Sequence, residues 1–332
     1  MNKFLKILLI ILGSIVSLVV ISFLPIWDDA SIVDSDLTAT IATAVKPADN
    51  AYEILPKFSE LTTTETNALE LINTTAPLAD RLGKLTPTQQ KKFITDTTGL
   101  VEKFKQASAK PAYQCPKLQN VYGRAAEGCD LSTLQKISQV TAIHAYYHGT
   151  NGNVSEATKL AESLLKLAHL IQQQEEPGML IEYLMSMAMK LNAVDIIDAK
   201  ITQPLVTTKY QIQPVFIENA LLREYKDTKA MILEGFGPNA IATYWFQPNQ
   251  TINDFAKFTR VDIARIVVPC GKTPDMTAAT NAFNRIRQPL DLKLLLNQNF
   301  KGNLLLNVIL AGYGGQGGIR DKACELNTRL SK

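Results

Sequence analysis

The first long apolar stretch of the chain is residues 7–27, ILLIILGSIVSLVVISFLPIW, which contains no charged side chain. In a helix that rises about 1.5 Å per residue, a stretch of this length covers the roughly 30 Å hydrocarbon core of a bilayer. Lys3 and Lys6 precede the stretch, and Asp28 and Asp29 follow it. The positive N-terminal side predicts a single-pass transmembrane anchor with residues 1–6 in the cytoplasm and the rest of the chain outside.

A cleaved secretory signal peptide is the alternative interpretation, because it also has a basic start and an apolar middle. The apolar region of such a peptide is roughly 7–15 residues long and is followed by small residues at the cleavage site. Here the apolar stretch is longer and ends in FLPIW, residues 23–27. The pattern favours a retained anchor in the inner (cytoplasmic) membrane and a periplasmic C-terminal domain.

Residues 28–47 show no helical periodicity and are rich in Asp, Ser and Thr, which indicates a spacer or a first strand-like segment. Beyond them, in residues 48–332, capping residues and apolar positions three or four apart predict a series of amphipathic helices. These helices are expected from Pro87 towards Ala109, from Asp130 to Gly149, from Asn153 through Ile171, from Pro177, from Pro214 to Glu234, from Asn249 to about Val267, and from Ile319. Short loops predict that the second, third and fourth of them are antiparallel neighbours.

The sequence therefore predicts a mostly α fold class for the extracytoplasmic domain, either an irregular helical bundle or a helical-repeat (TPR-like) fold. The residue signature of a tetratricopeptide array does not recur along the chain. In the helix after Pro177, the apolar stripe expected to face the core is Leu180, Tyr183, Leu184, Met187, Leu191 and Val194. The Tyr and Met side chains of residues 146–189 are the ones we expect to line a partner-binding face, although many of them are also candidates for the core.

Composition excludes a strongly charged partner such as nucleic acid. The 34 basic and 31 acidic residues give a net charge of +3, and two of the lysines precede the apolar stretch. A nearly neutral outer domain gives no electrostatic basis for nucleic-acid binding. The 46% hydrophobic and 20% charged residues are typical of a folded domain rather than a disordered stalk.

Four cysteines lie after the predicted anchor, at Cys115, Cys129, Cys270 and Cys324. None forms a C-x-x-C motif, and an even number in an oxidising compartment favours two structural disulfides. Of the three connectivities, we favour Cys115 with Cys129, which closes a short loop, and Cys270 with Cys324, which joins two late segments. A loop of the first size contributes about 3 kcal/mol in the chain-entropy model.

His144 and His148 are one helical turn apart, a spacing that lets two imidazoles bind one metal ion. The glutamate of H-E-x-x-H is missing, so a third ligand such as Glu162, His169 or Glu182 would have to come from elsewhere. Packing at the end of a helix is the alternative interpretation of both histidines.

Other candidate motifs are incomplete. Met179, Met185, Met187 and Met189 are close in sequence, but only Met185 and Met189 share a helix face, which favours core packing over a copper site. Residues 312–317 match G-x-G-x-x-G, yet the chain leaves no room for the second strand and acidic residue of a dinucleotide site. Ser163 and Lys166 form S-x-x-K without its companion motifs. We expect no cofactor.

Three short stretches carry a resemblance to a known group of proteins: ADNAY at 48–52, QPNQTIN at 247–253 and NFKGNLLL at 299–306. With them, the chain resembles a family of bacterial proteins that combine an N-terminal anchor with an all-helical outer domain and have no assigned activity. The resemblance implies an architecture and no chemistry. The leading hypothesis is a membrane-tethered interaction or scaffold protein that is not an enzyme and binds an envelope partner; the alternative is an envelope metal-dependent hydrolase or metal-handling protein that uses His144 and His148.

Overall fold

A computed structural model of the chain describes residues 34–38, 44–72, 76–81, 85–116, 129–174, 180–235, 248–273, 277 and 317–331. Within these residues the protein is all-α, as predicted, and its only extended pairing is an isolated bridge between Asn50 and Ala112. Short 3-10 turns connect the helices. Among the described residues, the helices of eight or more residues are α2 (Thr63–Glu70), α3 (Pro87–Ser108), α4 (Leu131–Thr150), α5 (Val154–Gln172), α6 (Leu180–Asp198), α7 (Pro214–Gly235), α8 (Pro248–Ile266) and α12 (Gly317–Leu330).

In the part of the chain that the structure describes, no helix is both long and apolar enough to cross a membrane. The predicted anchor, residues 7–27, lies outside the described residues. So do residues 312–316 of the G-x-G-x-x-G stretch and Met179.

The chain divides into two compact units. We call the larger one the main unit; it consists of residues 39–224, 269–271 and 316–332. The second unit consists of residues 1–38, 225–268 and 272–315. The main unit therefore contains α2 to α6 and α12, the second unit contains α8, and each contains part of α7.

The predicted N-caps of the main unit are confirmed. The Thr86 hydroxyl accepts a hydrogen bond from the Gln89 backbone at 3.3 Å, and the Gln89 side chain accepts one from the Thr86 backbone at 2.8 Å, which is a capping box. Asp130 caps α4 and Asn153 caps α5, each through a side-chain oxygen that accepts from the backbone N–H three residues further on. These caps satisfy backbone N–H groups that have no partner inside the helix.

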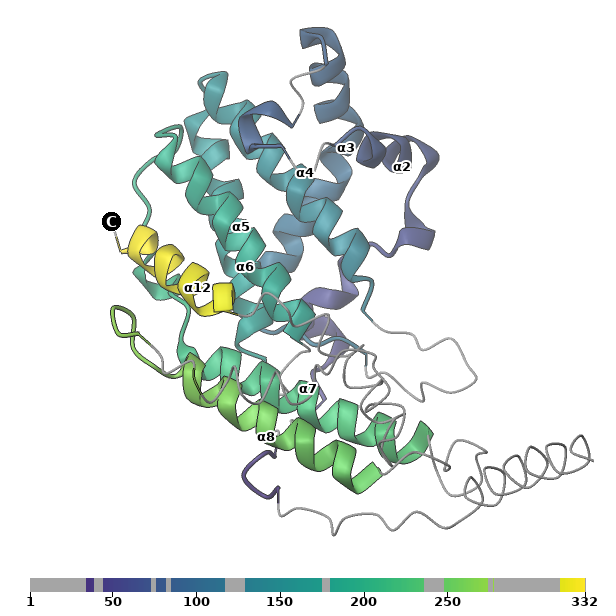
Figure 1. The fold of residues 1–332 in the computed structure, drawn as a ribbon. Helices are drawn as coiled ribbons and strands as arrows, with labels where there is room; N and C mark the ends of the chain where they lie inside the picture. The colour runs from purple at the N-terminus through teal and green to yellow at the C-terminus, as the bar shows by residue number, and fades with distance from the viewer. Residues whose placement is uncertain are drawn as a thin grey trace, which may run out of the picture. The chain divides into compact units, whose positions relative to one another are not determined.

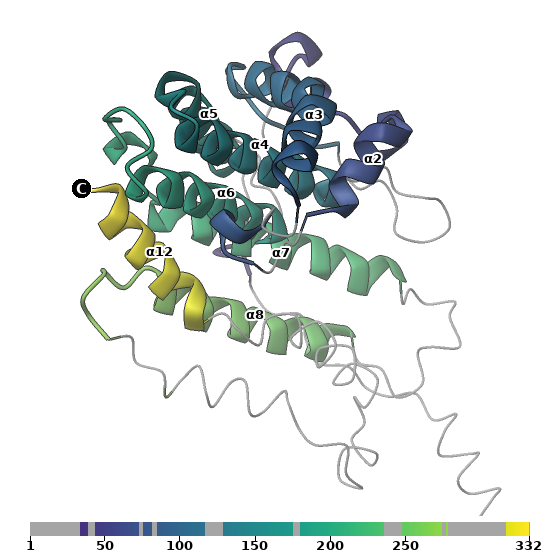
Figure 2. The same cartoon turned by 90° about the horizontal axis from the view of Figure 1, so that it is seen from above.

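Helices α3, α4, α5 and α6 pack side by side (Figures 1 and 2). The connection from α4, which ends at Thr150, to α5, which begins at Val154, is short. The apolar positions of α5 that lie three or four residues apart are buried: Leu160, Ala161, Leu164, Leu165 and Ala168 are at most 1% exposed. Burying each leucine contributes about 1.5–3 kcal/mol, so α5 is the centre of the apolar core.

Helix α4 continues past Gly149, where the sequence analysis placed its end. It ends at Thr150, and Gly152 has the positive φ of 83° that lets the chain turn away. Gly149 serves another purpose, because a Cβ atom there would lie 2.7 Å from Ile201. The missing side chain allows the segment after α6 to approach α4.

Helix α12 returns the end of the chain to the main unit. The Thr207 hydroxyl donates to the Leu330 carbonyl at 2.6 Å, and Arg329 pairs with Asp195 and Asp198 on α6 at 2.7 and 2.8 Å. A disulfide joins Cys270 to Cys324, whose Cα atoms are 5.7 Å apart. This is the pairing favoured from the sequence.

In the second unit, the segment Asp34–Leu37 contacts α7 and α8. The Asp34 carboxylate accepts hydrogen bonds from Tyr225 at 2.7 Å and from Lys229 at 2.5 Å, while Leu37 is 4% exposed. Arg260 of α8 donates two hydrogen bonds to Asp36. Part of the predicted 28–47 spacer is thus bound to the helices of its own unit.

Candidate functional site

Helix α6 has an unusual distribution of polar and apolar residues. Its inward face carries Glu182, Ser186 and Lys190, which are spaced four residues apart and are at most 5% exposed. We call these three residues the inner row. In most helices of a folded domain the polar residues face water and the apolar ones face the core.

The outward face of α6 is apolar. From Leu180 to Val194, the only exposed positions are Ile181, Leu184, Ala188 and Leu191. We call these four residues the outer row; Ile181, Leu184 and Leu191 are 56%, 39% and 43% exposed. Their 3-4-3 spacing is that of the a and d positions of a coiled coil, and ten residues of helix extend for about 15 Å.

The predicted buried stripe of α6 is therefore only partly correct. Leu180, Tyr183, Met187 and Val194 are buried, but Leu184 and Leu191 are exposed. The positions that the leucines were expected to fill in the core are taken by the inner row. The sequence did contain a signal, because polar residues recur at every fourth position within the otherwise apolar residues 180–191.

Each member of the inner row is hydrogen-bonded, which is what makes its burial tolerable. Lys190 donates to the Gln172 side chain at 2.5 Å and to the Tyr210 carbonyl at 2.6 Å, and Gln172 donates to Ser186 at 2.8 Å. Burial lowers the pKa of Lys190 from 10.5 to about 7, because the charged ammonium loses its water. Ser186 and Lys190 are fully enclosed, so neither can contact a substrate in this conformation.

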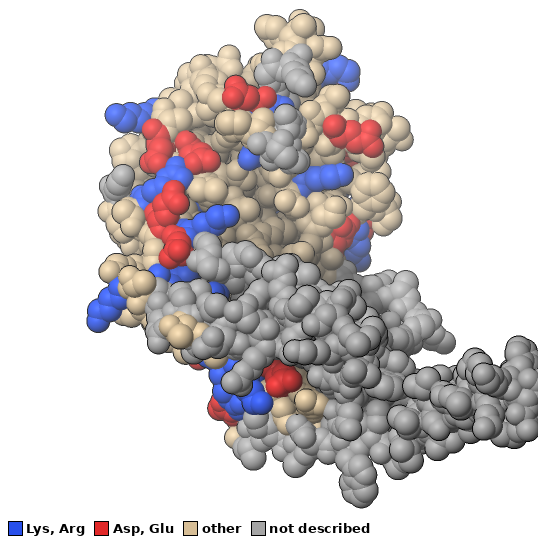
Figure 3. All heavy atoms as spheres, viewed as in Figure 1, with Lys and Arg blue, Asp and Glu red and all other residues tan. Residues whose placement is uncertain are grey.

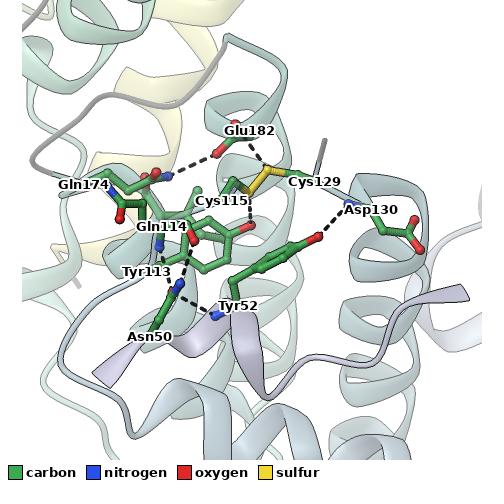
Figure 4. The surroundings of a disulfide bond; sticks show 10 residues. Asn50, Tyr52, Tyr113, Gln114, Cys115, Cys129, Asp130, Gln174 and Glu182 are labelled. Atoms are coloured by element: carbon green, nitrogen blue, oxygen red, sulfur yellow. Dashed lines mark hydrogen bonds between the residues drawn. A yellow bond between two sulfur atoms is a disulfide. The ribbon is translucent and has the colours of Figure 1, made fainter. Parts of the chain in front are cut away.

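At the start of the inner row, Glu182 faces the Cys115–Cys129 disulfide (Figure 4). This is the other pairing favoured from the sequence, with Cα atoms 5.5 Å apart. Oε1 of Glu182 is 3.7 Å from Sγ of Cys129, and its Oε2 accepts a hydrogen bond from Gln174 at 3.1 Å.

His144 is buried between α4 and α3. Its Nε2 lies 2.7 Å from the Thr97 hydroxyl, and that hydroxyl donates its proton to the Phe93 carbonyl at 2.7 Å. The Thr97 oxygen must therefore accept from His144, which places the imidazole proton on Nε2. Burial, with a smaller contribution from the charge of His148, lowers the pKa of His144 to about 3.

The structure does not bring the expected third metal ligand to the two histidines. The rings of His144 and His148 are 6.1 Å apart between centroids. Among the described residues, the only three His, Cys, Asp or Glu ligand atoms within 4.8 Å of one another belong to Cys115, Cys129 and Glu182. His169 packs edge-on against Tyr210 and Phe216 instead. A metal at His144 and His148 stays a prediction. Because Nε2 of His144 carries a proton, only its Nδ1 has a lone pair with which to bind a metal ion.

The methionines of α6 are core residues. Met185, Met187 and Met189 are at most 8% exposed, and Tyr183 is 3% exposed. They fill the interior beside the inner row, so these side chains of α6 do not form the exposed face that the sequence led us to expect. Ser163 is buried as well, and its hydroxyl donates to the Lys159 carbonyl.

Figure 3 shows one face of the molecule, on which basic and acidic side chains alternate instead of gathering into a patch of one sign. Among the charged side chains of the described residues, several are paired, for example Lys166 with Glu162 at 3.2 Å and Lys105 with Glu156 at 3.0 Å. Comparison with protein-family models, curated proteins and solved structures finds no match. The interpretation of function therefore rests on α6 and its surroundings.

Proposed function

We propose that the protein is a membrane-tethered extracytoplasmic scaffold whose outer row on α6 binds an amphipathic helix of another envelope protein. The observation that carries this proposal is the outer row itself. Exposed apolar side chains are ordinary when they are scattered, but here four of them form a continuous line over three helical turns. A partner helix with apolar residues at the same spacing would cover them by knobs-into-holes packing.

The tether is the uncharged stretch at residues 7–27, and the outer domain is an irregular helical bundle or a TPR-like helical repeat. Two disulfides support an oxidising compartment such as the periplasm. The seven residues from Trp27 to Asp34 extend at most about 25 Å. Because Asp34 is bound to Tyr225, this length would hold the second unit close to the membrane surface.

A photo-crosslinking side chain at Ala188, in the full-length protein in its native membrane, tests the proposal. We expect one predominant adduct whose crosslinked peptide is an amphipathic helix of an envelope protein. Leu184→Asp should abolish it, because a charge in the middle of the row would have to be buried against the partner. The matched control is the same probe at Val206, which is 73% exposed and lies outside α6.

Adducts that are equally abundant with the probe at Ala188 and at Val206 would overturn the proposal. An adduct with a second copy of the chain would also overturn it, because the outer row would then be a self-association surface. Circular dichroism of Leu184→Asp establishes that the variant is folded, since an exposed position tolerates a charge.

A further inference from the structure

The Cys115–Cys129 disulfide of the main unit lies beside a buried carboxylate, that of Glu182 (Figure 4). The two sulfur atoms and a carboxylate oxygen of Glu182 all lie within 4.8 Å of one another. Glu182 is 5% exposed, and both cysteines are half-buried. Among the described residues, no second trio of potential metal ligands is this close together.

We propose that reduction of this disulfide creates a zinc site, in which the Cys115 and Cys129 thiolates and the Glu182 carboxylate bind one Zn²⁺ ion. A water molecule occupies the fourth position. Two thiolates and one carboxylate suit zinc, which takes sulfur and oxygen ligands in a tetrahedral arrangement.

The distances agree with this assignment. Zn–S bonds of about 2.3 Å and Zn–O bonds of about 2.0 Å place tetrahedral sulfur and oxygen ligands about 3.5 Å apart. Sγ of Cys129 and Oε1 of Glu182 are already 3.7 Å apart. Two sulfur ligands of zinc are about 3.8 Å apart, a separation that the side chains reach by rotation once the bond between them is broken.

Neighbouring residues orient the ligands, as the second shell of a metal site does. The Gln174 side chain donates to Oε2 of Glu182 at 3.1 Å and so turns Oε1 towards the sulfurs. The Tyr113 hydroxyl lies 3.1 Å from Sγ of Cys115. A disulfide sulfur carries no hydrogen, so the hydroxyl is the donor in this contact.

The chemistry balances with a dithiol reductant, such as the reduced form of a thiol–disulfide exchange protein. The reductant transfers two electrons and two protons to the Cys115–Cys129 bond and becomes a disulfide itself. Zinc binding then releases the two thiol protons to water as both Zn–S bonds form. In the oxidised protein the sulfurs are bonded to each other, so the site is closed to zinc.

The test uses the full-length Cys270→Ser/Cys324→Ser variant, whose only cysteines are Cys115 and Cys129. Zn²⁺ alone is the probe, and binding is measured by competition with a chromogenic chelator before and after reduction with a phosphine. We expect one Zn²⁺ per reduced chain and none per oxidised chain. Adding Glu182→Gln should weaken binding by at least about tenfold, and Gln174→Ala should weaken it by about 10–100-fold.

No zinc uptake after reduction, or equal affinity in the Glu182→Gln variant, would overturn the inference. If the double serine variant does not fold, zinc binding can be tested in the reduced wild-type chain by measuring how fast its thiols are alkylated. Zn²⁺ should then slow alkylation of Cys115 and Cys129 but not of Cys270 and Cys324, as read by mass spectrometry. Equal rates with and without Zn²⁺, or equal protection of all four thiols, would contradict it.

Discussion

Nε2 of His144 donates a hydrogen bond to the hydroxyl of Thr97 at a distance of 2.7 Å, and this bond joins α4 to α3 inside the core. Both residues are at most 2% exposed. The bond gives a structural reason for one of the two histidines that had suggested a metal site. The buried N–H of the His144 imidazole has the Thr97 hydroxyl as its acceptor.

Replacing Thr97 by valine keeps the shape of the side chain and removes the oxygen. The buried N–H of His144 then loses its acceptor, so we expect the free energy of unfolding to fall by about 1–3 kcal/mol. Chemical denaturation measures the change. Thr98→Val is the matched control, because Thr98 is exposed on the same helix and should change stability by less than about 0.5 kcal/mol. Equal losses in the two variants would refute the argument.

Acid should destabilise the protein below about pH 6.5. Burial lowers the pKa of His144 to about 3, and burial together with the charges of Lys190 and Lys209 lowers that of His169 to about 4. Between these values and 6.5, the unfolded chain binds protons that the folded chain does not, so the free energy of unfolding decreases as pH falls. Denaturation at pH 7, 6, 5 and 4 should show this decline. His144→Gln should make it shallower, whereas the half-buried His148→Gln should leave it in place.

The buried ammonium of Lys190 should affect the free energy of unfolding on the alkaline side of pH 7. Its pKa is about 7 in the folded protein and 10.5 in the unfolded chain, so the unfolded state binds the additional proton between these values. Stability should therefore rise with pH above 7, by up to about 1.4 kcal/mol per pH unit. Lys190→Met should flatten the profile between pH 7 and about pH 10. The exposed Lys159→Met is the control, and a profile that Lys190→Met leaves unchanged would show that this ammonium is not the cause.

Two glycines should respond to alanine in opposite directions. At Gly149 the new methyl group would lie 2.7 Å from Cβ and the carbonyl oxygen of Ile201, so we expect a loss of about 1–3 kcal/mol from the steric clash. At Gly99, in the middle of α3, the nearest atom would be 3.8 Å away, and alanine should gain about 0.5–1 kcal/mol through its helix propensity. Thermal unfolding of both variants measures these changes in stability. A more stable Gly149→Ala variant would contradict the close approach of Ile201 to Gly149.

Asp34 should contribute more than Asp36 to keeping the segment Asp34–Leu37 bound to α7 and α8. Asp34 accepts hydrogen bonds from Tyr225 and Lys229 in a partly buried site, and these bonds contribute to the lowering of its pKa. Asp36 pairs with Arg260 in water, where ion pairs contribute little. Limited proteolysis of the full-length chain should therefore cut Asp34→Ala near this segment faster than Asp36→Ala. Equal cleavage would mean that Leu37 alone holds the segment.

Local signals in the sequence were sufficient for most helices of the main unit. Thr86, Asp130 and Asn153 cap helices where the pattern placed them, because a capping side chain bonds to backbone only three residues away. The stripe of α5 was equally clear, since its core face is uniformly apolar. Gly149 shows where local reasoning fails: its role is set by Ile201, which is 52 positions further along the chain.

The sequence by itself determined the all-α class and the starts of α3, α4, α5 and α7, and it favoured the cysteine pairs that the structure joins. These depend on contacts within a few residues, or on a small number of pairing choices. Only the tertiary structure decided which face of α6 is inside. The polar side chains of Glu182, Ser186 and Lys190 can be buried because residues outside α6 form hydrogen bonds with them. These partners are Gln174, Gln172 and Tyr210. Once those partners take the inner row, helix geometry leaves Leu184 and Leu191 facing water, and a hydrophobic pattern alone cannot distinguish that surface from a core.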